Sequence, residues 1–177
     1  MSKNEVKKYL KGLDHESLQK MILDLYSISK EAKDYLEYSI NPNDHAKYVE
    51  IRDLIDREFV ETYRYRRLKF TKCKNAISYF KKLDPVPEMI AELMVYMVEK
   101  ATRTASIWGN AEPSFIDSLA SNYNSAGRFL VANNLQEKYS KRMDMLYHEI
   151  DNFGYGAYML MSDVHNQMLT PKCDEPK

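Results

Sequence analysis

Residues 87–108 form the stretch that most constrains the fold of this chain. Apolar side chains recur there at helical spacing and widen to more than half of the circumference. The central apolar positions are Ile90, Leu93, Met94, Met97, Ala101, Ala105 and Trp108, and the polar face carries Glu88, Glu92, Glu99 and Arg103. Pro87 fits a first helical position, and Gly109-Asn110 fits a left-handed exit. Because so broad an apolar face needs several neighbours, we expect this helix at the centre of the fold.

Further helical patterns lie on both sides of this stretch. Turn residues separate them, such as Asn41-Pro42-Asn43-Asp44 and Asp84-Pro85-Val86-Pro87. Only five glycines and six prolines occur in 177 residues, which favours long helices over short strands. Short connections stack successive helices as antiparallel neighbours. We therefore predict an all-α fold: a single compact domain over residues 1–169, with about seven or eight helices as antiparallel hairpins around the helix at 87–108, and a flexible tail over residues 170–177.

Charge and cysteine usage exclude several classes of protein. The chain has 26 lysines and arginines against 26 aspartates and glutamates, so no field of one sign steers a partner toward the whole molecule. Cys73 and Cys173 lie far apart and outside any cysteine or histidine metal spacing, which favours a reduced, cytoplasmic protein. The first residues lack the apolar core of a signal peptide, and no stretch has the length and apolarity of a membrane span. We expect no cofactor and no membrane contact.

The strongest local charge bias lies in residues 62–83, which contain eight lysines and arginines and no acid. A phosphate backbone favours such a cluster because binding releases counterions, and aromatic side chains can stack on unpaired bases. The candidate partner-binding or polyanion-binding residues are Tyr63, Arg64, Tyr65, Arg66, Arg67, Lys69, Lys72 and Lys74. An acidic protein surface would also suit them. So would a solvated helix face, or ion pairs with the acidic residues of 53–61. The pattern leaves these alternatives open.

Histidines and paired acids were the remaining candidates for chemistry. His148 lies four residues after Asp144, and His165 lies two after Asp163, but no Glu-x-x-His or His-Glu-x-x-His pair occurs. We therefore predict no metal site. Glu92 and Glu99 share a helix face, yet Arg103 follows Glu99 by four residues, which is the spacing of an ordinary stabilising pair. The chain has no nucleophile elbow, phosphate loop or Rossmann glycine pattern, so no catalytic residue is predicted. An enzyme with a scattered site stays open as a third class.

Ten methionines and fourteen tyrosines favour a binding role. Methionines at core-like positions fill gaps in a helical core or form an adaptable groove for a partner helix. Tyrosine is common where one edge is buried and the other is wet, including interfaces. We expect a non-enzymatic helical interaction or adaptor protein that binds a protein partner or a second copy of itself, with Arg64, Arg66 and Arg67 as a charged rim. The alternative is nucleic-acid or polyanion binding through residues 62–83.

Several pieces of the chain, taken in order, carry a family resemblance. They are residues 36–43, which end in Ile-Asn-Pro-Asn, together with residues 78–88, 91–99, 108–118 and the Gly-Tyr-Gly-Ala-Tyr run of 154–158. In this order they resemble an uncharacterised bacterial family that is catalogued only as a domain of unknown function. The shared pieces are turn and core residues. The resemblance implies a small helical protein without an established activity, and it assigns a role to no residue.

Overall fold

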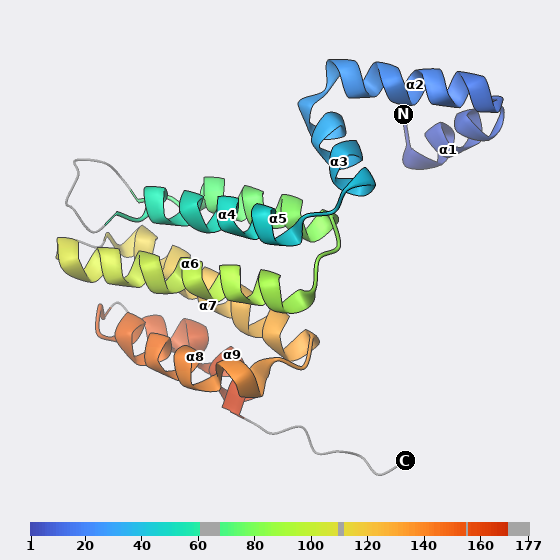
Figure 1. Cartoon of the computed structure of the whole chain (residues 1–177). Helices are drawn as coiled ribbons and strands as arrows, with labels where there is room; N and C mark the ends of the chain where they lie inside the picture. Colours follow the sequence, from blue (N-terminus) through green and yellow to red (C-terminus); the bar gives the residue numbers. More distant parts are fainter. Residues whose placement is uncertain (61–67, 110–111, 155, 170–177) are drawn as a thin grey trace, which may run out of the picture. The chain divides into compact units, whose positions relative to one another are not determined.

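The computed structural model describes residues 1–60, 68–109, 112–154 and 156–169, which form nine α-helices and no strand (Figure 1). This confirms the predicted all-α fold. The count is one above the predicted range because Ser29 separates two helices that the sequence pattern nearly joins. Ser29 has an extended backbone, with φ −124° and ψ 117°. Its hydroxyl accepts a hydrogen bond of 3.2 Å from the backbone N–H of Ala32, so it ends one helix and caps the next.

Contacts among the described residues divide the chain into two units, Met1–Asn43 and Asp44–Lys177. The first unit contains α1 (Lys3–Lys11), α2 (His15–Ile28) and α3 (Lys30–Ile40). The second contains α4 (Asp44–Glu58), α5 (Thr71–Lys82), α6 (Pro87–Trp108), α7 (Pro113–Ala132), α8 (Gln136–Asp151) and α9 (Ala157–Leu169). The single domain over residues 1–169 stays a prediction, and the tail at 170–177 lies outside the described residues.

Helix α6 is the centre of the second unit, as its broad apolar face predicted. It packs against α4, α5, α7 and α8, and Figure 1 shows α4 and α5 on one side of it and α8 on the other. Every position predicted to be inward is buried except Trp108, which is only partly buried next to the end of the helix. The helix ends at Gly109, whose φ of 63° is the left-handed conformation that glycine adopts without strain.

The closest helix packing in the second unit involves Gly127. This glycine is buried on α7, which has its largest contact with α9. A Cβ atom built on Gly127 would overlap Cγ1 of Val164, and it would also touch side-chain atoms of Met143 and Met168. The absence of a side chain at this position therefore lets α9 approach the backbone of α7.

The first unit has well-formed helix ends. Ser2 and Glu5 form a capping box on α1, and the carboxylate of Asp14 accepts a 2.7 Å hydrogen bond from the backbone N–H of Ser17 on α2. Helices α2 and α3 are joined by Tyr26, whose hydroxyl donates to Oε1 of Glu37 over 2.9 Å. Local signals therefore set where these helices begin, as the sequence predicted.

Candidate interaction surfaces

The first unit presents large apolar side chains to solvent. No residue of 1–43 is buried, and Leu23, Ile28 and Ile40 are 64%, 80% and 84% exposed. We call the exposed apolar side chains of this unit the α1–α3 apolar face; its other members are Val6, Tyr9, Ile22, Leu25 and Tyr35. The sequence pattern predicted most of them to point inward, and that prediction is wrong. The helices form where expected, but three short helices enclose too little volume to bury both sides of each apolar stripe.

Charge on the first unit is balanced. Residues 1–43 contain seven lysines against seven aspartates and glutamates. A partner with a strong charge of one sign would therefore gain little from this unit as a whole. Burial of apolar surface is the larger favourable term that the α1–α3 apolar face can supply.

The predicted basic stretch divides into parts with different surroundings. Tyr63, Arg64, Tyr65, Arg66 and Arg67 lie outside the described residues. Lys69, Lys72 and Lys74 are described, and all three are exposed. The Nζ atom of Lys72 lies 2.8 Å from Oε1 of Glu58 on α4, so the ion-pair interpretation applies to that residue. Lys69 and Lys74 instead line a pocket between α5 and α7.

This α5–α7 pocket has a volume of about 500 Å³. One wall comes from the start of α5 and the residues before it, and the other comes from the first half of α7. The lining residues are Leu68, Lys69, Phe70, Thr71, Lys74, Ser114, Phe115, Asp117, Ser118, Ser121 and Asn122. The structure thus brings two of the predicted basic residues together with polar residues of a different helix.

The first turn of α5 faces this pocket without a side-chain cap. Phe70 occupies the capping position, and it has no side-chain atom that can accept a hydrogen bond. Its ring instead packs in the core, 5.4 Å from the ring of Phe115 and 5.1 Å from that of Phe59. Core packing has therefore replaced capping at this helix end, which leaves the positive end of the α5 dipole beside Lys69 and Lys74.

A row of small polar residues lines the α7 wall of the pocket. Ser114, Ser118, Ser121 and Asn122 recur at the spacing of one helix face. Asn122 is only 5% exposed, and its Nδ2 donates a 2.6 Å hydrogen bond to the carbonyl of Ser118. Its Oδ1 has no hydrogen-bond partner within the described residues. Sequence reasoning missed this row, although serine and asparagine at helical spacing on an otherwise apolar helix were a usable signal.

Glu92 and Glu99, the candidate acid–base pair, are both bound by Arg142 of α8. Nη1 of Arg142 lies 2.6 Å from Oε2 of Glu92, and Nε lies 2.7 Å from Oε1 of Glu99. Burial raises the pKa of Glu92, but the hydrogen bonds and the charge of Arg142 outweigh burial and lower it below its usual value. A carboxyl that stays ionised is poorly suited to act as a general acid at neutral pH. The predicted partner was Arg103, four residues from Glu99; the observed one is forty-three residues away.

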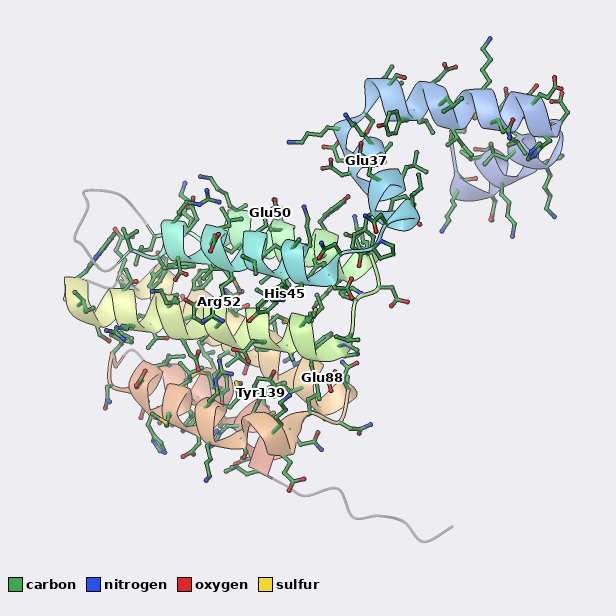
Figure 2. All side chains as sticks on the ribbon, in the orientation of Figure 1. Glu37, His45, Glu50, Arg52, Glu88 and Tyr139 are labelled. Atoms are coloured by element: carbon green, nitrogen blue, oxygen red, sulfur yellow. The ribbon has the colours of Figure 1, made fainter. Side chains whose placement is uncertain are left out.

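Polar contacts also join α6 to α4 on its other side. The hydroxyl of Tyr96 donates a 2.7 Å hydrogen bond to Oδ1 of Asp56, and the guanidinium of Arg52 lies 4.4 Å from the centre of the Tyr96 ring. Figure 2 shows Arg52 between α4 and α6, and Tyr139 between α6 and α8. The hydroxyl of Tyr139 donates to the carbonyl of Glu88 over 3.5 Å. These groups hold the helices of the second unit together.

The predicted histidine pairs are rearranged in the structure. His165 lies beside Asp144 of α8, with 3.5 Å between Nε2 and Oδ1, and not beside Asp163 as the sequence spacing suggested. Its Nδ1 lies 2.9 Å from the hydroxyl of Tyr123, and its ring stacks on Tyr147 at 3.9 Å. Burial lowers the pKa of His165, which favours the neutral ring. Within the described residues, no group of three or more His, Cys, Asp or Glu side chains is placed to hold a metal ion.

The fold defines an all-helical protein with an apolar face on one unit and a basic pocket on the other. A family model described as Family of unknown function (DUF6155) matches residues 1–153, which include residues of both units. The chain belongs to this family, and the match confirms the resemblance found in the sequence. No curated protein and no solved structure matches the chain. Among the described helices, none has the length and apolarity needed to span a membrane.

Proposed function

We propose that this protein is a helical interaction protein, and that its α1–α3 apolar face binds an amphipathic helix of a protein partner or of a second copy. One observation carries the proposal: a unit of three amphipathic helices has no buried residue and exposes most of the surface of Ile28 and Ile40. Soluble proteins rarely expose such clusters of large apolar side chains unless the cluster is an interaction site.

The expected strength of such binding follows from apolar burial. Full burial of one leucine or isoleucine side chain contributes about 1.5–3 kcal/mol. Several members of the α1–α3 apolar face are at least half exposed, so a partner helix that covers a few of them would gain several kcal/mol. Because the unit has balanced charge, added salt should change the affinity little.

We predict that the double variant Leu23→Glu, Ile28→Glu will lose its protein partner while it keeps its helix content. Both side chains are mostly exposed, so the charges cost little in the free protein but oppose burial in a complex. Affinity purification from the native host, with mass spectrometry and nuclease-treated controls, should give a partner for wild type that the variant retains at least about tenfold less. Sedimentation velocity of the purified chain would detect a second copy as the partner.

The matched control is Lys20→Glu. It lies on the same helix, it is exposed, and it changes the net charge by the same two units. This control should keep the partner. Equal retention of the same protein by wild type and by the double variant would contradict the proposed role of the α1–α3 apolar face.

Nucleic-acid or polyanion binding through residues 62–83 is the second candidate function. The observation that favours it is the position of Lys69 and Lys74, which are exposed and line one pocket. We predict that replacing Arg64, Arg66 and Arg67 with glutamine will abolish oligonucleotide binding and leave the melting temperature nearly unchanged. Binding of the wild type should weaken steeply with added salt, because phosphate contacts release counterions. Lys72→Gln is the control, since Lys72 pairs with Glu58. Undiminished binding by the triple variant would rule this candidate out.

A further inference from the structure

We propose that the α5–α7 pocket binds a small phosphate monoester whose body carries hydroxyl groups, such as a nucleotide or a sugar phosphate. This site is separate from the α1–α3 apolar face, and the inference does not rest on the proposed protein partner. Its volume of about 500 Å³ is within the range of small-molecule sites. The pocket has two chemically different walls, and each wall selects a different part of the ligand.

The α5 wall suits the phosphate group. Lys69 and Lys74 supply two positive charges, and no ion pair to either is found among the described residues. The uncapped first turn of α5 lies between them in the sequence and adds backbone N–H donors at the positive end of the helix dipole. Lysine binds phosphate as a point charge, and a phosphate monoester near neutral pH carries close to two negative charges. The charges of this wall and of the ligand therefore match.

The α7 wall suits the hydroxyl-bearing body. The carboxylate of Asp117 lines the pocket and would repel a phosphate, so it orients the phosphate toward the α5 wall. Oδ1 of Asn122 is a hydrogen-bond acceptor on a side chain that is more than nine-tenths buried, and it has no partner within the described part of the chain. A buried acceptor without a partner is costly, and a ligand hydroxyl that donates to it would remove that cost. Asp117 can accept from a second hydroxyl.

This two-sided chemistry predicts a preference that a simple basic patch would not have. Inorganic phosphate can use only the α5 wall, and an unphosphorylated sugar can use only the α7 wall. A phosphate monoester with hydroxyl groups uses both walls at once. It should therefore bind more tightly than either part alone.

The test is titration of the full chain with ribose 5-phosphate, adenosine monophosphate, inorganic phosphate and ribose, followed by amide chemical shifts. We expect saturable shifts at residues 69–74 and 114–122 for the two phosphate esters, with weaker binding of phosphate and ribose. Similar affinity for both esters would identify a sugar-phosphate site, and tighter binding of the nucleotide would identify a nucleotide site. Either result supports the inference. Absence of saturable binding by both esters at millimolar concentrations would overturn it.

Variants separate this site from general surface charge. The double variant Lys69→Gln, Lys74→Gln should weaken both esters at least about tenfold, because each lysine contributes a charge-assisted contact. Lys72→Gln changes a lysine of the same helix that pairs with Glu58 outside the pocket, and it should change affinity less than about twofold. Asp117→Asn should strengthen inorganic phosphate and reduce the preference for the esters. Equal weakening by Lys72→Gln and by the double variant, or no change in preference with Asp117→Asn, would overturn the assignment.

Discussion

Gly127→Ala is expected to destabilise the second unit by about 2 kcal/mol, even though alanine is the better helix former. In an exposed helix the change would stabilise by about 1 kcal/mol. Here the added Cβ overlaps Cγ1 of Val164 on α9. Valine has one strongly preferred side-chain rotamer in a helix, so Val164 cannot readily turn away, and α9 must shift. Overpacking of this kind typically costs about 1–3 kcal/mol. Urea unfolding followed by circular dichroism would measure the change.

A double-mutant cycle isolates the contact between Gly127 and Val164. Val164→Ala alone should cost about 1–2 kcal/mol through lost apolar contacts. In the double variant, the smaller side chain makes room for the new Cβ, so the two losses should add to less than their sum by at least about 1 kcal/mol. Gly12→Ala is the control, because its φ of −88° suits alanine and its Cβ would meet only the carbonyl oxygen of Tyr9 at 3.4 Å. It should be neutral or slightly stabilising. Additive losses in the cycle would contradict the proposed overlap.

Arg142→Met is expected to destabilise the protein by about 2 kcal/mol at pH 7. The substitution keeps most of the apolar stem but removes four hydrogen bonds to Glu92 and Glu99. The two carboxylates would then lie near each other without their cation. Breaking a fully buried ion pair costs about 3–5 kcal/mol. The three side chains here are about one third exposed, so solvent screening reduces the expected loss.

The loss caused by Arg142→Met should depend on pH. The folded pKa of Glu92 is lowered, so its contribution to stability is present above the ordinary glutamate pKa of 4.5 and is lost as pH falls through the folded value. The stability difference between wild type and Arg142→Met should therefore shrink below about pH 4.5. Lys141→Met is the matched control: it is exposed on the same helix and should have little effect at any pH. A difference that stays constant from neutral to acidic pH would exclude Arg142 as the cause.

Helix positions could be predicted because their signals are local. Ser2, Asp14 and Ser29 cap helices where the sequence suggested a start or a break, and Pro87 and Gly109 delimit α6. Each of these residues acts on backbone groups within a few positions of itself. The central place of α6 was also predictable, because the breadth of an apolar face requires several packing partners.

Side-chain partners were predicted less well. The sequence paired Glu99 with Arg103 and His165 with Asp163, whereas the structure places Glu99 with Arg142 and His165 with Asp144. Helical spacing identifies only neighbours on one helix, so a partner on another helix has no local signal. The polar row on α7 was overlooked because its position beside Lys69 and Lys74 depends on how α5 packs against the rest of the second unit.

The amino-acid sequence by itself determined the fold class, most of the helix boundaries and the central helix of this protein. These features depend on backbone conformation and on the periodicity of side chains within one helix. Only the tertiary structure decided that the α1–α3 apolar face is exposed, that Gly127 admits α9, and that two lysines and Asn122 line one pocket. Burial and contact are distances in space between residues far apart in the chain, and those distances exist only after the helices have packed.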